Sequence, residues 1–305
     1  MKLQNTSIIT FISLILLSFN SYSEGLSDKI SACTLALNKG DAVTALNRAD
    51  EALKLNPTNR DALLCQGRAL GAQGKYNEAL SALQQAENQS KEPFDKVISN
   101  LLIGNLQKEN QKNVEAIASY EKSLGICKTE KNDKFARISH NLIGEAHAQN
   151  KDYNAALTSY TAGSGLAMND NERADSYERL AATYKALGQY DAAIEYQLKG
   201  MLMQKKAGTL DQYANASLEL GQIYILARDY PGAEKTLSKF LQFAKENGGA
   251  YYEAKASLYL AQSKAASGDL TSAKTLLADA RNIAKNVGDK DLMGEIEATG
   301  KNLEK

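Results

Sequence analysis

Histidine, cysteine, proline and tryptophan are scarce in this sequence of 305 residues. The chain contains two His, three Cys, three Pro and no Trp. Two His and three Cys offer little material for a metal site or for a fold held by several disulfides. Three Pro is a low number against an average usage of about 5%. The scarcity of His and Cys disfavours metal-dependent proteins and proteins held together by several disulfides. The scarcity of Pro permits long uninterrupted helices.

An excess of charge of either sign is also absent. The 36 Lys and Arg residues balance 36 Asp and Glu residues. Non-specific binding to nucleic acids or to anionic membranes needs an excess of Lys and Arg, so neither is expected. With 43% hydrophobic residues the composition is that of a soluble globular chain rather than of a disordered one, and the length alone suggests about two domains.

The first 23 residues resemble a secretory signal peptide. Lys2 precedes an apolar run over residues 8–19, and Ser21 and Ser23 supply small residues at the −3 and −1 positions of a cleavage site. The run of twelve residues is shorter than the roughly 20 that a membrane-spanning helix needs. No Cys follows the run directly, which disfavours a lipoprotein anchor. We expect cleavage after Ser23 and a bacterial periplasmic or secreted protein. The alternative is an uncleaved segment that anchors the chain in the inner membrane, facing the periplasm.

Small residues recur in two parallel series along the rest of the chain. The first series is Ala45, Ala79, Ala116, Ala156, Ala193, Ala233 and Ala273. The second series is Cys33, Gly67, Gly104, Gly144, Ala181, Gly221 and Ala261. The steps of both are 34, 37, 40, 37, 40 and 40 residues, and each member of the second lies twelve residues before its partner. Two series in one register indicate an internal repeat of seven units.

A turn separates the two small residues of each unit, and helical spacing surrounds them. The turns begin at Gly40, Gly74, Gln111, Lys151, Gly188, Arg228 and Gly268. In the fifth unit Tyr177, Leu180, Ala181 and Tyr184 follow the i, i+3, i+4, i+7 spacing of one helical face. Each unit is therefore predicted to be two antiparallel helices joined by a tight turn, with the small residues where the helices cross closely.

The repeat resembles the tetratricopeptide repeat. The second unit carries Gly67, Gly74, Tyr76, Ala79 and Ala86 at positions of that family's pattern, and the resemblance extends over about residues 26–287. The chain departs from the family in lacking Trp and in having units of 37 to 40 residues after the second, as in its long-repeat variant. The resemblance implies an all-α, right-handed α-solenoid of about seven repeats.

The predicted organisation has three parts. A signal peptide occupies residues 1–23, the array of seven repeats occupies residues 24–288, and a C-terminal capping helix occupies residues 289–305. Leu292, Ile296 and Leu303 line one face of that last segment, with charged residues on the other face. Such a polar-backed helix suits the end of a repeat array.

No catalytic constellation is present in the sequence. It contains no Gly-x4-Gly-Lys-Ser/Thr phosphate loop and no His-Glu-x2-His motif. His140 and His147 lie seven residues apart with Glu145 between them, but these positions match large core residues of the family, and zinc needs a third protein ligand. We therefore predict no enzymatic activity, no metal and no cofactor.

The three cysteines are interpreted as reduced thiols, tolerable where buried. Cys33 occupies one of the small-residue positions, Cys65 lies two residues before another, and Cys127 lies at a unit end. A bridge between Cys33 and Cys65 is the alternative. It requires Cα atoms within about 7 Å, whereas packed helices are usually about 8–10 Å apart.

The resemblance implies a concave groove lined by the first helix of each unit. The candidate partner-binding residues are Asn105, Asn141, Glu145, Arg179, Lys185, Asn215, Glu219, Gln222 and Tyr259. The groove positions mix both charges with a single aromatic, whereas a nucleic-acid groove would be basic and aromatic-rich. The family's clamp for a terminal carboxylate is incomplete, because Leu101, Leu142 and Asp175 stand where Lys, Asn and Lys are required.

These patterns favour a non-enzymatic, exported scaffold that binds a protein or peptide partner in the groove. One alternative is an assembly factor for an envelope complex, tethered by an uncleaved N-terminal segment. The other is a peptide-sensing regulator. Neither nucleic acid nor a small-molecule cofactor is expected as a partner.

Overall fold

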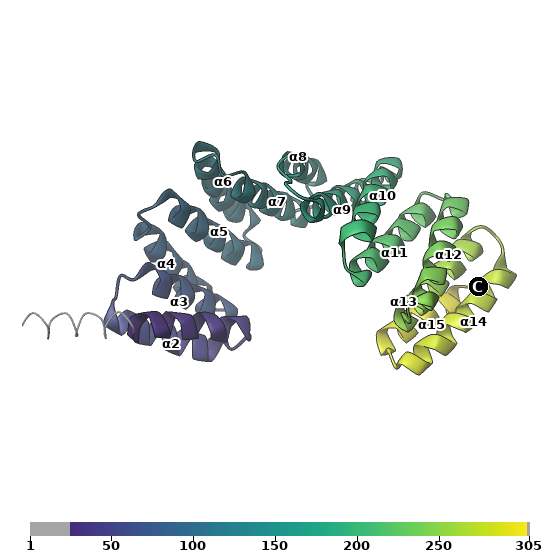
Figure 1. Cartoon of the computed structure of the whole chain (residues 1–305), viewed down its shortest axis with the longest axis horizontal. Helices are drawn as coiled ribbons and strands as arrows, with labels where there is room; N and C mark the ends of the chain where they lie inside the picture. Colours follow the sequence, from purple (N-terminus) through teal and green to yellow (C-terminus); the bar gives the residue numbers. More distant parts are fainter. Residues whose placement is uncertain (1–24, 304–305) are drawn as a thin grey trace, which may run out of the picture. The chain divides into compact units, whose positions relative to one another are not determined.

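The computed structural model describes residues 25–303, and within that range the chain consists of helices joined by turns, with no strand (Figure 1). The predicted signal peptide lies outside the described residues. None of the described helices is both long enough and apolar enough to cross a membrane. The prediction of an all-α fold of repeated helical pairs is confirmed.

The helices follow one another along the chain with short connections. Residues 25–38 are helical. The helices after them are α2 (Ala42–Leu55), α3 (Arg60–Ala72), α4 (Tyr76–Asn88), α5 (Pro93–Glu109), α6 (Asn113–Thr129), α7 (Asp133–Gln149), α8 (Tyr153–Ser164), α9 (Asp170–Ala186), α10 (Tyr190–Ala207), α11 (Leu210–Leu226), α12 (Tyr230–Glu246), α13 (Ala250–Ala266), α14 (Leu270–Val287) and α15 (Lys290–Leu303).

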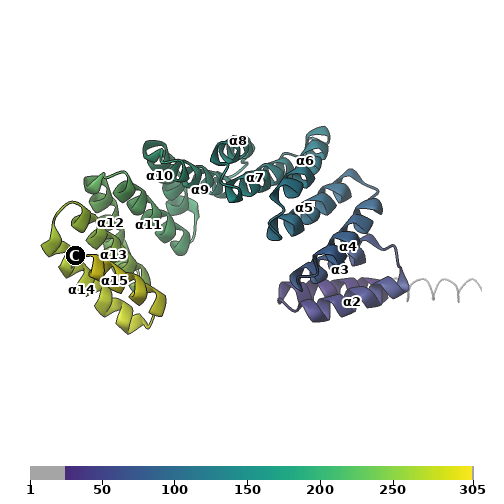
Figure 2. The same cartoon turned by 180° about the vertical axis from the view of Figure 1, so that it is seen from behind.

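The chain divides into two compact units. The first unit ends at Asn150 and contains α2 to α7, and the second begins at Lys151 and contains α8 to α15. Within each unit every helix packs against its neighbours in the sequence, as both views show for α3, α4 and α5 and for α9, α10 and α11 (Figures 1 and 2). The division falls in the turn of the fourth repeat, and the repeat periodicity gives no sign of it.

Glycines allow the close helix crossings that the repeat predicts. A Cβ atom added to Gly104 would lie 2.4 Å from Cε1 of Tyr120, and one added to Gly221 would lie 2.4 Å from Cδ2 of Leu237. At Gly67 the nearest atom, Cγ of Leu83, would lie at 2.6 Å. Such distances are below any real non-bonded carbon–carbon contact, so the helices at these three crossings can pack this closely only over glycine.

The first residue of each turn within a repeat has a left-handed backbone. The glycines at positions 40, 74, 188 and 268 have φ between 71° and 92°. The other three turns place Gln111, Lys151 and Arg228 in the same conformation, with φ of 61°, 60° and 59°. A side chain with a Cβ costs roughly 1 kcal/mol or more in this region of backbone space, so these turns are strained relative to the glycine turns.

The predicted capping segment packs on the core of the second unit. Leu292 and Ile296 of α15 are fully buried and belong to one cluster with Leu237, Phe240 and Leu258. Their burial removes the apolar end of the last repeat from water, which is the role that the sequence pattern assigns to a terminal helix.

The structure corrects the interpretation of three reduced thiols. Cys33 and Cys65 form a disulfide, with their Cα atoms 6.4 Å apart and a sequence separation of 32. Both side chains are buried in a cluster that also contains Ala45, Ala49 and Ala69. The expectation compared the separation of helix axes with a limit on Cα atoms, and Cα atoms that face each other across two packed helices lie closer together than the axes do, so the bridge fits. Cys127 remains a buried free thiol, and its burial raises its pKa.

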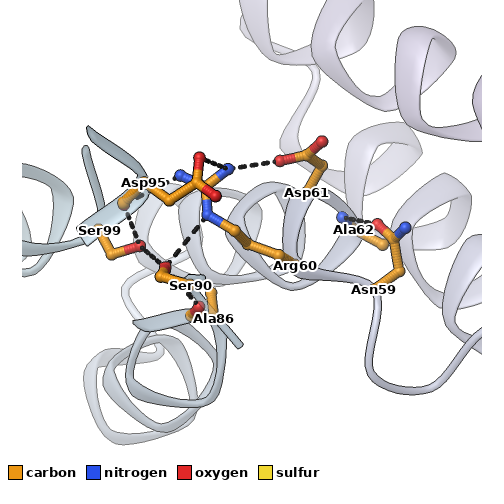
Figure 3. Close-up of polar contacts among 8 residues, drawn as sticks. All are labelled: Asn59, Arg60, Asp61, Ala62, Ala86, Ser90, Asp95 and Ser99. Carbon is orange, nitrogen blue, oxygen red and sulfur yellow. Dashed lines mark hydrogen bonds and ion pairs between the residues drawn. The ribbon is translucent and has the colours of Figure 1, made fainter. Parts of the chain in front are cut away.

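Arg60 joins three helices of the first unit through a closed polar network (Figure 3). Its Nε donates to Oγ of Ser90 at 3.2 Å, and one terminal nitrogen donates to the carbonyl oxygen of Asp95 at 3.0 Å. The guanidinium also forms ion pairs with the carboxylates of Asp61 and Asp95, at 2.8 and 3.4 Å. Oγ of Ser90 lies 3.2 Å from Oγ of Ser99 and donates to the carbonyl of Ala86 at 3.0 Å. The chain itself thus supplies acceptors for this largely buried cation.

Candidate functional site

The predicted partner-binding residues of the first unit are engaged in contacts within that unit. Lys108 of α5 forms an ion pair with Glu145 of α7. The hydroxyl of Tyr120 donates to Oδ1 of Asn105 at 2.7 Å. Asn141 is 6% exposed. The first two contacts join α5 to α7 and to α6, and the amide of Asn141 is buried.

A pocket of about 370 Å³ lies between the helix of residues 25–38, α3, α4 and α5, and we call it the first-unit pocket. Its lining comprises Leu37, Gly67, Arg68, Gly71, Ala72, Leu83, Leu102, Asn105, Leu106 and Glu109. One cation and one carboxylate stand among mostly apolar residues, and the floor side chain from α4 is the buried Leu83.

The charged residues of the second unit are partly paired. Nε of Arg179 donates to Oδ1 of Asp175 on the same helix at 3.0 Å, and the guanidinium lies 5.8 Å from the ring centre of Tyr160. Lys185 of α9 forms an ion pair with Glu219 of α11. This second pair links α9 and α11, the first helices of consecutive repeats.

A pocket of about 390 Å³ lies among α9, α10 and α11, and we call it the second-unit pocket. Its lining comprises Glu178, Ala182, Gln197, Gln204, Gln212, Asn215, Ala216 and Glu219. Six of these eight side chains are polar or charged, and no cation is among them. The volume falls in the range of about 300–1,000 Å³ found for ligand sites.

Three of the sequence-predicted residues come together at this pocket. Asn215 and Glu219 line it, and Lys185 is paired with Glu219 at its edge. Asn215 is exposed, so its amide is accessible to a partner. Gln222 is half-buried and lies outside the lining. Tyr259 is only 8% exposed and belongs to the core of the second unit.

Two glutamines that sequence reasoning did not single out as functional form the α10 side of the second-unit pocket. Gln197 is 2% exposed and Gln204 is 5% exposed. Nε2 of Gln197 donates to the carbonyl of Ala216 at 3.0 Å, and Nε2 of Gln204 donates to Glu178 at 3.0 Å. Oε1 of Gln204 is buried and accepts no hydrogen bond. An unsatisfied buried acceptor costs about 1–3 kcal/mol, so this arrangement is not optimal for folding alone.

Comparison of equivalent positions in the repeats identifies both glutamines from the sequence alone. The residues four positions after the small residue of the second helix are Leu83, Tyr120, Tyr160, Gln197, Leu237 and Leu277 in the second to seventh repeats. The residues eleven positions after it are Ser90, Cys127, Ala167, Gln204, Ala244 and Ala284 in the same repeats. A long polar side chain occurs at either position only in the fifth repeat.

Glu178 has an unusual electrostatic environment for a surface helix. Partial burial raises the pKa of its carboxyl above the ordinary value, and the neighbouring carboxylate of Asp175 acts in the same direction. The hydrogen bond from Gln204 and the charge of Arg179 oppose this shift. No salt bridge to Glu178 is formed by any residue of the described range. The carboxylate therefore faces neutral amides.

The histidines do not form a metal centre with other residues of the described chain. Within residues 25–303 no group of three or more His, Cys, Asp or Glu side chains is arranged to hold a metal ion. Burial lowers the pKa of His140, which keeps its imidazole neutral at a pH where an exposed histidine would begin to charge.

Comparisons with known proteins agree with the repeat architecture. The family model described as "Tetratricopeptide repeat" matches residues 174–206, which span most of α9 and α10. Outer dynein arm-docking complex subunit 4 from Mus musculus is 28% identical over 188 residues, which cover 61% of this chain and 30% of the mouse protein. The chain thus spans less than a third of the length of this curated relative.

Solved structures show the same fold at low sequence identity. The apo form of RapI superposes with a TM-score of 0.70 at 14% identity, over 92% of this chain and 82% of RapI. A signal-transduction ATPase with a tetratricopeptide-repeat sensor, from Pyrococcus horikoshii, superposes with a TM-score of 0.63 at 16% identity, over 83% of this chain and 40% of the ATPase chain. At these identities the likeness extends to the fold alone.

Proposed function

We propose that this chain, an α-solenoid built of tetratricopeptide-like repeats, is an exported, non-enzymatic scaffold that binds a protein or peptide partner. The repeat fold supports protein–protein interaction in general. The partner occupies the second-unit pocket among α9, α10 and α11. A fold does not determine a function, so the proposal rests on the site rather than on the resemblance.

The observation that carries the proposal is the chemistry of the second-unit pocket. Glu178, Gln204 and Asn215 present hydrogen-bonding groups that the chain itself leaves incompletely used or exposed. The lining combines these polar side chains with the small side chains of Ala182 and Ala216. Such a surface suits an extended or amphipathic peptide segment, which binds through backbone and side-chain hydrogen bonds.

Two features support export to an oxidising compartment. The N-terminal sequence has the charged start, apolar middle and small residues of a secretory signal. The Cys33–Cys65 disulfide is of the kind that forms and persists outside the reducing cytosol. The second feature is independent of the first, because the two cysteines lie in the folded first repeats.

Site-specific photo-crosslinking tests the binding assignment. A photoreactive amino acid at position 182, on the exposed wall of the second-unit pocket, is expected to crosslink a partner in cells of the native organism. The matched control places the same amino acid at Val114, which is 73% exposed on α6 of the first unit. Equal crosslinking at both positions, or none at position 182, would remove the assignment of the pocket.

Fractionation and N-terminal sequencing test the export. We expect the protein in the periplasmic fraction, with Glu24 as its first residue. An intact N-terminus in the membrane fraction would instead favour the tethered assembly factor. A cytoplasmic protein with reduced Cys33 and Cys65 would refute the export.

A further inference from the structure

The second-unit pocket contains one carboxylate, that of Glu178, that has no ion-pair partner among the described residues, and the nearby charge of Arg179 offsets its burial only in part. Around it, Glu219 is paired with Lys185, and Asp175 is paired with Arg179. Glu178 instead accepts a hydrogen bond from the neutral amide of Gln204. A ligand that brings a single positive charge would balance the site.

Amide side chains accompany Glu178 in the lining of the pocket. Oε1 of Gln204 accepts no hydrogen bond although the side chain is 95% buried, since its exposed fraction is 5%. The exposed amide of Asn215 faces the pocket from α11. The pocket therefore offers the carboxylate oxygens of Glu178 from α9 and the amide oxygen of Asn215 from α11, which suits a ligand rich in N–H donors and disfavours an anion or an apolar group.

We infer that the second-unit pocket holds the side chain of an arginine from the bound partner. The inference rests on the proposed peptide-binding function and names the chemistry that the partner must carry. A guanidinium group provides five N–H donors in a planar fork, so it can bind Glu178 with two of them and use others for Oδ1 of Asn215. A lysine ammonium carries the same charge but has three donors and no planar fork, so it uses fewer of these acceptors.

The electrostatics of Glu178 agree with this geometry. Partial burial raises the pKa of its carboxyl in the free protein, and the charge of Arg179 offsets this shift only in part. An arginine beside it supplies a further counter-charge and favours the ionised form. The carboxylate is thus costly in the free protein and stabilised in the complex.

The experiment begins with a random nonapeptide library displayed on phage and selected on the purified full-length protein. We expect the enriched peptides to share an arginine. One enriched peptide is then synthesised with that arginine and with citrulline, a neutral group of nearly the same shape. The wild-type protein is expected to bind the arginine peptide at least about tenfold more tightly than the citrulline peptide, which corresponds to about 1.4 kcal/mol.

Three variants locate the effect. Glu178→Gln keeps the shape of the side chain and is expected to reduce the preference for arginine to about twofold or less. Gln204→Ala, which places there the small residue found in the sixth and seventh repeats, is expected to weaken the arginine peptide more than the citrulline peptide. Glu109→Gln, in the first-unit pocket, is the matched control and should leave the preference unchanged.

The outcomes separate this inference from the proposed function. Peptides that bind the protein but tolerate citrulline as well as arginine would overturn the inference and leave the scaffold function standing. An unchanged arginine preference in the Glu178→Gln variant would also overturn it. A library that yields no binding peptide at all would overturn the proposed function itself.

Discussion

The two pockets occupy comparable places in their repeats but differ in what forms their floor. Leu83 of α4 and Gln197 of α10 both lie four residues after the small residue of their helix, and both are almost fully buried. In the first-unit pocket the wall charges of Arg68 and Glu109 have opposite signs, whereas those of the second-unit pocket are both negative. The same backbone geometry can therefore present a mostly apolar surface or a polar one, depending on a few side chains.

A second contrast concerns the partners that surround a partly buried charged side chain in each unit. Arg60 of the first unit is surrounded by carboxylates, a hydroxyl and a carbonyl from its own unit (Figure 3). Glu178 of the second unit has a neutral amide as its hydrogen-bond donor. A closed network favours stability and leaves little for a ligand to add. An open one sacrifices stability and retains capacity for binding.

The largest predicted effect is the loss of stability of the first unit, but not of the second, when the disulfide is removed. Replacing both Cys33 and Cys65 by Ser removes a cross-link that closes a loop with a sequence separation of 32. We expect a loss of about 3.5 kcal/mol in the free energy of unfolding, because the unfolded chain regains the entropy that the loop withheld. Hydrogen exchange followed by mass spectrometry should place the loss in α2 to α4. Reducing the wild-type disulfide should reproduce it, and equal loss in the second unit would contradict the expectation.

The next prediction exchanges the two floor residues. Leu83→Gln is expected to cost about 2–4 kcal/mol, because it loses apolar packing and buries an amide in an apolar site. Gln197→Leu is expected to raise stability by up to about 1 kcal/mol, because leucine is the residue that the sixth and seventh repeats bury in this register. Thermal unfolding followed by circular dichroism measures both. If Gln197→Leu destabilised the protein, Gln197 would contribute to the stability of the fold. The comparison between an apolar Leu83 and a binding-competent Gln197 would then be wrong.

The fold could be predicted from the sequence because its determinants are local and repeated. The spacing of small residues places the helix crossings, and the structure has glycines against Tyr120 and Leu237 where that spacing predicts them. The division at Asn150 could not be predicted, because the repeat register continues through it unchanged. The disulfide could not be predicted from a typical separation of helix axes, because facing Cα atoms lie closer together than the axes, as the 6.4 Å between Cys33 and Cys65 shows.

The candidate site could be predicted only in part. Sequence reasoning selected exposed positions on the first helices, and it found Asn215 and Glu219. It did not single out Gln197 and Gln204, because they lie on a second helix and occupy positions that the repeat reserves for the core. A buried polar residue in one repeat, where the other repeats bury apolar or small ones, is the observation that points to a site of this kind.

The third prediction concerns a feature that both units share, a turn that begins with a non-glycine residue in the left-handed conformation. Gln111 in the first unit and Arg228 in the second both begin a turn with a left-handed backbone. Replacing either by glycine is expected to stabilise the protein by about 1 kcal/mol, since glycine carries no penalty for this conformation. The measurement is the midpoint of urea unfolding for each variant. Gln111→Ala and Arg228→Ala are the controls, and they should show no such gain because alanine retains the Cβ. A gain in only one unit would mean that the turn is not the cause.

The smallest predicted effect concerns the pH dependence that Glu178 gives to the second unit. Because the pKa of this carboxyl is raised in the folded protein, the folded state holds its proton more tightly than the unfolded state does. Its contribution to stability is therefore fully present below 4.5, the ordinary pKa of a glutamate carboxyl, and is lost as the pH rises through the folded pKa. Glu178→Gln should thus stabilise the free protein more at pH 7 than at pH 4, in measurements of urea unfolding at both values. The partial exposure of the side chain keeps the difference small, and Glu109→Gln provides the matched loss of a carboxylate from the first-unit pocket. If Glu178→Gln instead destabilised the protein at pH 7, the carboxylate of Glu178 would stabilise the fold, as the carboxylates around Arg60 do. The contrast between the satisfied polar network around Arg60 and the unsatisfied one around Glu178 would then be wrong.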